Sequence, residues 1–311
     1  MDLPLTLHVT RRAMLARDIL GLTCTAESLP DWTPGAHVTL ETPGGALRPY
    51  SLCGAPGEAW QFGIKLEAAG RGGSAAMHGL AVGATLRASA PRNDFPLTTP
   101  GTSHLFIAGG IGITPIMAML RAIEAEGGKP WKLIYLTRDA AGTAFLDELA
   151  PQRGRVTIHH DGGDPEQAFD LWPLLEQPKG RHIHCCGPRG LMQAVRDMTG
   201  HWPASAVHFE DFSAGQSTAR ADDAPFTARL ARSGRDVPVP AGTTLMAALD
   251  AAGIAVPRSC EAGSCGSCRS TLLAGTADHR DLVLMDHERA TQIMPCVSRA
   301  APGCDMLVLD L

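Results

Sequence analysis

The 311-residue sequence predicts a multidomain protein of the α/β plus β class, and three changes of pattern along the chain support this prediction. Short alternating strands come first, strands that alternate with helices follow, and a compact α+β segment with a cysteine-rich loop ends the chain. We place the domains at residues 1–102, 103–212 and 226–311, and we interpret the small, polar residues 213–225 as a linker.

Composition narrows the functional class. The formal net charge of −5 and the pI near 6.2 argue against a nucleic-acid partner. The longest uncharged apolar run, residues 105–120, is shorter than the roughly 18 residues of a membrane span. The first residues also lack the basic-then-apolar order of a signal peptide. We therefore expect no membrane association and a cytoplasmic location, in which cysteines outside a metal site stay reduced.

Residues 1–102 predict an antiparallel barrel or sandwich, because short runs such as 37–41, 60–65 and 84–87 are separated by glycine- and proline-rich turns. Within them, Arg48, Tyr50 and Ser51 combine a phosphate-binding guanidinium, a flat ring and a hydroxyl. An ordinary edge strand explains these residues as well. The turn Gly70–Ser74 would present N–H groups to a phosphate, and together the two motifs favour a bound nucleotide such as a flavin.

Residues 103–212 predict a parallel sheet with helices on its faces. A buried strand at 104–108 precedes the turn Gly109–Pro115 and a helix that runs to Gly127, which is the setting of a dinucleotide-binding turn. We expect Thr114 to cap that helix and Pro115 to begin it. Further strands at 132–136, 156–160, 181–187 and 206–210 alternate with helices. Four histidines on these strands are interpreted as structural or solvent-facing and not as metal ligands: His159, His160, His182 and His184.

The spacing of Cys260, Cys265 and Cys268, with Cys296 further along, is the plant-type pattern for a [2Fe–2S] cluster. Each iron needs two thiolates, so four cysteines complete the site. Glycines between the first three let the loop curl and direct N–H groups at the sulfurs. Cys296 follows a stretch with a helical pattern, so we expect it to come from a separate element. Zinc is the alternative, although the second ligand pair of a zinc ribbon is missing.

These three signatures, in this order, resemble the phthalate dioxygenase reductase family, which includes vanillate O-demethylase reductase subunits. The resemblance implies an antiparallel flavin-binding β-barrel, an NAD-binding α/β domain and a C-terminal β-grasp ferredoxin domain. For FMN it implies a phosphate site of Arg48, Gly73 and Ser74, ring contacts from Tyr50 and Ser51, and further contacts from Ile64 and Lys65. For the dinucleotide it implies a crevice lined by Gly110, Gly112 and Thr114, with Cys186 near the nicotinamide and Phe212 closing the flavin face. From the residues alone, Cys186 is equally well explained as a buried structural thiol.

The implied function is an NADH-dependent oxidoreductase that passes electrons through FMN and the cluster, one at a time, to a Rieske-type oxygenase partner. Ser51 and Cys186 would stand at the hydride-transfer site. Asp139 favours NADH because an acidic residue suits a free ribose 2′-hydroxyl, whereas the adjacent Arg138 suits a 2′-phosphate. FAD in place of FMN, a cytochrome P450 or other hydroxylase as acceptor, and a redox-sensing protein without turnover remain open at this point.

Overall fold

The computed structural model describes residues 2–68, 72–97, 103–127, 130–212, 220 and 223–311. Packing divides the chain into two compact units: Met1–Val195 with Ala206–Glu210, and Arg196–Ser205 with Asp211–Leu311. Most of the predicted linker, and Gly70 and Arg71 of the predicted phosphate turn, lie outside the described residues. The predicted domain boundaries remain predictions. No helix in the described ranges is long and apolar enough to cross a membrane.

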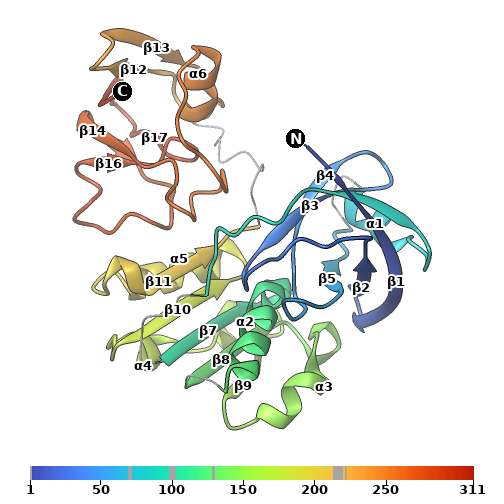
Figure 1. Cartoon of the computed structure of the whole chain (residues 1–311). Coiled ribbons are helices and arrows are strands. Elements are labelled where there is room, and N and C mark those ends of the chain that lie inside the picture. The colour runs from blue at the N-terminus through green and yellow to red at the C-terminus, as the bar shows by residue number, and fades with distance from the viewer. Residues whose placement is uncertain (1, 69–71, 98–102, 128–129, 213–219, 221–222) are drawn as a thin grey trace. The chain divides into compact units, whose positions relative to one another are not determined.

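The first unit begins with a curled antiparallel sheet of six strands in the order β4-β3-β6-β1-β2-β5 (Figure 1). The strands are β1 (Leu5–Ala16), β2 (Ile19–Thr25), β3 (His37–Glu41), β4 (Leu47–Ser51), β5 (Trp60–Lys65) and β6 (Thr85–Ala88), with the short helix α1 (Gly73–His78) after β5. Alternate side chains such as Leu7, Val38 and Phe62 point into one apolar core. The predicted antiparallel barrel agrees with this sheet, although the sequence analysis did not predict β2.

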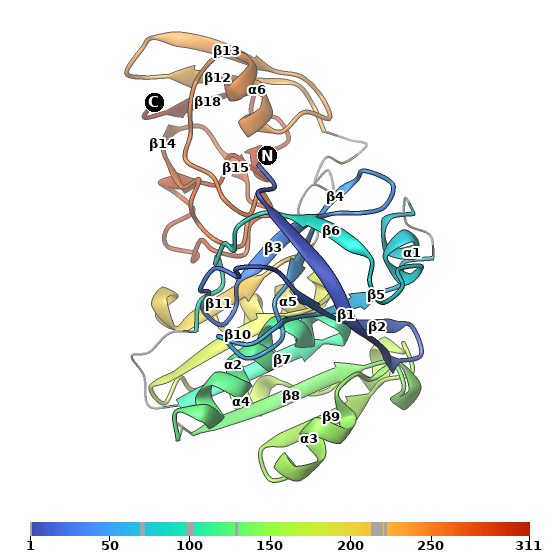
Figure 2. The same cartoon turned by 45° about the vertical axis from the view of Figure 1, so that its right-hand side comes forward.

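The second sheet of this unit has five parallel strands in the order β11-β10-β7-β8-β9. The strands are β7 (Ser103–Gly109), β8 (Trp131–Thr137), β9 (Val156–His160), β10 (Arg181–Cys186) and β11 (Val207–Glu210). Helix α2 (Ile113–Ala125) lies along the sheet in both views (Figure 1 and Figure 2). The remaining helices are α3 (Leu146–Leu149), α4 (Trp172–Leu175) and α5 (Arg189–Met198). This order is the predicted alternation of strands and helices.

The start of α2 corrects one prediction. The helix begins at Ile113, one residue before Thr114, with Gly112 in the capping position. The Thr114 hydroxyl donates back to the carbonyl of Ile111 at 3.0 Å and does not accept an N–H of the first turn. The short 3-10 turn Gly110–Gly112 runs directly into the helix, so the chain is already helical where a threonine cap would need an extended backbone.

The second unit contains a mixed sheet in the order β13-β12-β18-β14-β16 and one helix, α6 (Leu245–Ala251). Its strands are β12 (Phe226–Leu230), β13 (Arg235–Val239), β14 (Ser270–Ala274), β16 (Gln292–Ile293) and β18 (Met306–Leu309), with a separate pair β15 (Ala277–Asp278) and β17 (Arg299–Ala300). The stretch before Cys296 was expected to be helical. It consists of turns and then β16, so that expectation was wrong.

The register of the parallel sheet places side chains of neighbouring strands in rows on one face. Ala108, Cys186 and Glu210 pair across β7, β10 and β11 at the carboxyl end of the sheet. The row below contains Phe106, His184 and His208, and the next contains His104 and His182. The alternation of side chains along a strand therefore gathers four histidines, His104, His182, His184 and His208, on one face directly below the carboxyl end of the sheet.

His184 is the most buried of these histidines. Its ring stacks on His208 with centroids 4.7 Å apart, and Phe95 and Phe106 each lie 5.5 Å away. Nε2 lies 3.2 Å from the carbonyl of Pro96, whereas Nδ1 has no hydrogen-bond partner among the described residues. A second ring proton would therefore be buried without an acceptor. Burial, with neighbouring His208 and His104, holds the pKa of His184 well below 6.5.

This packing predicts that the first unit loses stability as the pH falls below about 6.5, the pKa of a histidine in the unfolded chain. There the unfolded chain binds a proton that folded His184 does not accept, at a cost of up to about 1.4 kcal/mol per pH unit. Urea unfolding of the first unit between pH 7.5 and 5.5 measures the slope. His184→Gln should flatten it, whereas His8→Gln, at an exposed position, should not. Equal slopes in both variants would contradict this account.

Candidate functional site

The phosphate-binding residues predicted in the first sheet lie together. A Cβ atom placed on Gly73, the first residue of α1, would lie 3.6 Å from Nε of Arg48 on β4. The Arg48 guanidinium is anchored through a 2.7 Å bond from Nη1 to the carbonyl of Leu47. Ser74 accepts the N–H of Glu67 at 3.0 Å, which fixes its hydroxyl beside the end of β5. The structure thus brings Arg48 on β4 together with Gly73 and Ser74 beside the end of β5, and these two strands are the two edges of the curled sheet.

Two neighbouring residues of β4 point to opposite faces. Tyr50 is half-buried, and burial raises its pKa while Arg48 acts in the opposite direction. Ser51 is buried, and its hydroxyl lies 3.5 Å from Oε2 of Glu210 on β11. The other oxygen of Glu210 lies 3.8 Å from Nδ1 of His37 on β3. Glu210 is therefore a site residue that the sequence analysis missed, although it ends the predicted strand at 206–210 and lies two residues before Phe212.

The dinucleotide turn packs backbone to backbone against the end of β10. A Cβ atom on Gly112 would lie 2.1 Å from the carbonyl oxygen of Cys186 and 2.8 Å from the nitrogen of Gly187. Only glycine fits such an approach. The antiparallel sheet also approaches this turn, because a Cβ atom on Gly63 of β5 would lie 2.7 Å from Cγ2 of Thr114. The flavin-side strand, the turn with Gly110 and the Cys186 strand therefore meet at one place.

Other predicted contacts already have structural partners. Asp139 follows β8, accepts the N–H of Gly142 at 2.8 Å and pairs with Arg17 at 3.0 Å. The hydrogen bond from Gly142, followed by that from Arg17, lowers the pKa of Asp139. The side chain of Ile64 is buried in the barrel core, and Lys65 pairs with Glu67 at 3.3 Å. Phe212 lies in the second unit with 40% of its surface exposed.

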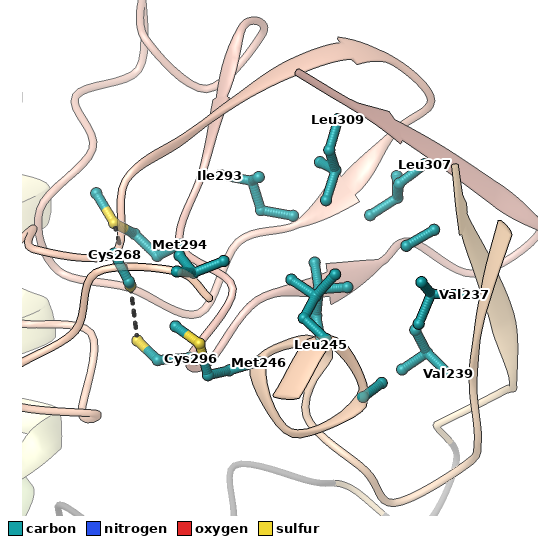
Figure 3. Packing of buried hydrophobic residues seen from close by; sticks show 14 of the residues in the cluster. Val237, Val239, Leu245, Met246, Cys268, Ile293, Met294, Cys296, Leu307 and Leu309 are labelled. Atoms are coloured by element: carbon teal, nitrogen blue, oxygen red, sulfur yellow. Dashed lines mark hydrogen bonds between the residues drawn. The ribbon is translucent and has the colours of Figure 1, made fainter. Parts of the chain in front are cut away.

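Four of the five cysteines of the second unit, Cys260, Cys265, Cys268 and Cys296, form two pairs. Sγ of Cys268 and Sγ of Cys296 are 3.2 Å apart at one edge of the apolar cluster, next to Met294 (Figure 3). Cys260 and Cys265 form the other pair and are partly exposed, with the N–H of Cys260 3.5 Å from Sγ of Cys265. Two thiolates per iron is the requirement of a [2Fe–2S] cluster, and the residues present fit it.

Local groups favour the thiolate form in each pair. The hydrogen bond from Cys265 lowers the pKa of Cys260 to about 5, and the N–H of Ala262 points at the Cys260 sulfur at 3.4 Å. The hydrogen bond from Cys296 likewise lowers the pKa of Cys268. The same hydrogen bonds raise the pKa of the partner thiols Cys265 and Cys296. Because thiolates and not thiols bind metal, one cysteine of each pair is favoured as a thiolate and the other would release its proton when metal binds. In the described part of the chain, no three His, Cys, Asp or Glu residues are placed to hold a single metal ion.

Comparison with known proteins agrees with this geometry. Residues 228–301 match the family model of the 2Fe-2S iron-sulfur cluster binding domain. The chain is 46% identical to phthalate dioxygenase reductase from Burkholderia cepacia, over 99% of this chain and 97% of that protein. The chain belongs to the phthalate dioxygenase reductase family.

Solved structures and a second relative extend the comparison. The structure of phthalate dioxygenase reductase, described as modular for electron transfer from pyridine nucleotides to [2Fe-2S], matches 98% of this chain and 97% of its own, with a TM-score of 0.68. Vanillate O-demethylase oxidoreductase from Pseudomonas sp. is 38% identical over 97% of this chain and 98% of its own. An intact type IV self-sufficient cytochrome P450 monooxygenase is 39% identical, with a TM-score of 0.71, over 98% of this chain but 41% of its own.

Membership of the phthalate dioxygenase reductase family confirms the predicted multidomain fold class and the predicted enzyme class, an NADH-dependent flavin and iron–sulfur oxidoreductase. FMN, NADH and the [2Fe–2S] cluster, the three predicted cofactors, are confirmed with it. The relatives are reductase components of oxygenase and O-demethylase systems. The roles of individual residues remain predictions.

The contact at Gly112 predicts that Gly112→Ala separates the turn from β10. We expect the first unit to lose about 2 kcal/mol of unfolding free energy, the usual cost of overpacking, and the KM for NADH to rise. Urea unfolding and NADH-dependent dye reduction measure the two effects. Gly154→Ala is the control, because nothing lies within 4 Å of the added methyl group. If Gly112→Ala behaves like this control, the close approach has no role in binding.

Proposed function

We propose that this chain is the cytoplasmic reductase component of a Rieske-type oxygenase or O-demethylase, to which it delivers electrons from NADH one at a time. The observation that carries this proposal is the meeting of three elements in the first unit. Ser51 of the flavin-side sheet, Glu210 of β11 and the Gly112–Cys186 contact all lie at the carboxyl end of the parallel sheet. Ligands bind at this end in open parallel sheets.

In this proposal the first unit binds two nucleotides side by side. Arg48, with Gly73 and Ser74, holds the FMN phosphate, because a guanidinium and backbone N–H groups suit a phosphate dianion. Tyr50, Ser51, Ile64 and Lys65 line the flavin. Gly110, Gly112 and Thr114 leave room for the dinucleotide pyrophosphate, and Asp139 faces its ribose. Cys186 stands beneath the nicotinamide, and Phe212 covers the flavin in the complete enzyme.

Bound flavin supplies the exchange between the two-electron chemistry of NADH and the one-electron chemistry of the cluster. The residues of the chain would position the flavin and the nicotinamide and exclude water around them. The Ser51 hydroxyl is oriented by the Glu210 carboxylate, which is itself buried and faces His37. Cys186 is fully buried against Ala108 and Ile113, so that water is excluded beneath the nicotinamide position.

The four thiolates would hold the cluster in two unequal environments. Cys268 and Cys296 belong to the apolar core of the second unit, whereas Cys260 and Cys265 are partly exposed. An electron acceptor can therefore approach the Cys260–Cys265 side without unfolding the domain. Plant-type clusters have potentials near about −400 mV, low enough to reduce an oxygenase.

The electron order is tested by Cys265→Ser. Loss of one ligand should remove the visible absorption of the cluster while leaving NADH-dependent reduction of ferricyanide through the flavin near the wild-type rate. Cys304→Ser is the matched control, since Cys304 is a thiol of the same unit that accepts the N–H of Thr276 at 3.3 Å. If ferricyanide reduction also disappears in folded Cys265→Ser protein with full FMN, the proposed order is wrong.

A haem oxygenase is the second candidate acceptor, and the similarity to the self-sufficient cytochrome P450 favours it. The two candidates differ in the acceptor that the holoenzyme reduces. We expect NADH to reduce a purified Rieske oxygenase in the presence of this chain faster than a purified bacterial P450, with both followed anaerobically at equal concentration. The reverse order would favour the haem acceptor.

A further inference from the structure

A buried carboxylate behind the cysteine loop has no place in the proposed ligand set. Asp281 is 2% exposed. Its Oδ2 accepts the N–H of Leu284 at 2.7 Å and that of Val283 at 3.1 Å, and its Oδ1 accepts the hydroxyl of Ser298 at 3.3 Å. Nδ1 of His279 approaches Oδ1 to 3.7 Å. Although burial raises the pKa of Asp281, the nearby imidazole of His279 and the hydrogen bonds from the backbone N–H groups outweigh it and lower the pKa. The group is therefore a carboxylate.

The position of Asp281 links the two segments that supply the cysteines. The N–H of Leu282 donates to the carbonyl of Gly263 at 2.9 Å, in the middle of the cysteine loop. Gly263 has a φ of +75°, and a Cβ atom there would lie 3.1 Å from Cα of Asp281. The backbone N–H of Gly263 also acts on the Cys296 thiol, where it favours the thiolate. Ser298 follows Cys296 by two residues, so its bond to Asp281 ties the second segment to the same carboxylate.

The neighbouring arginines do not neutralise this charge. Arg280 directs its guanidinium to Asp223, at 3.1 Å from Nη1, and to Asp278, at 2.8 Å from Nε. Arg299 donates to the carbonyls of Ala224 and Pro240 and lies over the ring of Phe226. Asp281 is thus left with an imidazole, a hydroxyl and two backbone N–H groups as its surroundings.

We propose that Asp281 tunes the cluster, its buried negative charge lowering the reduction potential of the [2Fe–2S] site held by Cys260, Cys265, Cys268 and Cys296. Reduction by one electron makes that site one unit more negative, and a fixed carboxylate nearby opposes the change. The effect is strong because little water screens charges inside the domain. Groups that surround the ligands are known levers on cluster potential, together with net charge and hydrogen bonds. This inference rests on the cluster ligands of the proposed function.

The test is a redox titration of the full-length holoenzyme carrying Asp281→Asn. Dithionite, with mediators, supplies one electron per cluster, and the reduced cluster is followed by electron paramagnetic resonance. We expect a higher midpoint potential than in the wild type. The amide oxygen still accepts the N–H of Leu284, so the turn is retained. Asp310→Asn removes the same charge from an exposed position paired with Arg232, and it should leave the potential unchanged.

Further variants separate the effect of the charge on Asp281 from the effect of its hydrogen bonds. Ser298→Ala removes the hydrogen bond to Asp281 and the one that Ser298 accepts from the N–H of Arg280, but it keeps the carboxylate, so its shift should be much smaller than that of Asp281→Asn. Should Asp281→Asn fail to hold the cluster, Asp281→Ser is titrated instead, since its hydroxyl can accept the same turn N–H groups and it carries no charge. An unchanged potential in either uncharged variant with full cluster content would overturn the proposal, as would cluster loss from both or an equal shift in Ser298→Ala.

The outcome is separable from a failure of the proposed function. A wild-type protein without iron or without the cluster signal would contradict the ligand set itself. A wild-type protein with a normal cluster, and an Asp281→Asn variant with the same potential, would contradict only the role of Asp281.

Discussion

The gathering of four thiolates into two close pairs is the constraint on which the second unit depends. Sγ of Cys268 and Sγ of Cys296 are 3.2 Å apart, and the N–H of Cys260 points at Sγ of Cys265. When both cysteines of a pair are deprotonated, their sulfurs repel each other unless a metal centre lies between them. Cys268 and Cys296 are also part of the apolar cluster formed by α6, β12, β14 and β18. Cluster binding and packing of this small domain are therefore one process, as in other small metal domains.

The first unit depends on two close approaches of the backbone that glycine residues permit. Gly112 allows the dinucleotide turn to lie against the backbone of Cys186, and Gly63 allows β5 to lie against Thr114. The parallel register then sets Cys186 beside Glu210, and Glu210 reaches Ser51 on β4. None of these residues is chemically unusual by itself. In the proposed function they would position two flat rings in a water-poor crevice, where distance and orientation control hydride transfer.

Local motifs explain why much of this site could be predicted from the sequence. The cysteine spacing and the turn Gly109–Pro115 specify loop shapes within a few residues, and the order of strands and helices specifies the sheets. Glu210 could not be found in this way, because its role depends on strand register and on a contact with β4 far away in sequence. Asp281 was not predicted for the same reason, because its role depends on its contact with Ser298, which is distant in sequence. The helix expected before Cys296 does not form. The apolar residues of this stretch that suggested a helix, such as Leu282 and Leu284, are buried loop residues.

The central claim is that electrons enter at the flavin in the first unit and leave through the cluster in the second. Anaerobic rapid mixing of the holoenzyme with one equivalent of NADH tests this most directly, with flavin absorbance and the paramagnetic signal of the reduced cluster followed together. The account predicts that flavin absorbance falls first and that the cluster signal then rises in the same molecules within the turnover time. A reduced flavin with no cluster signal on that timescale would contradict it.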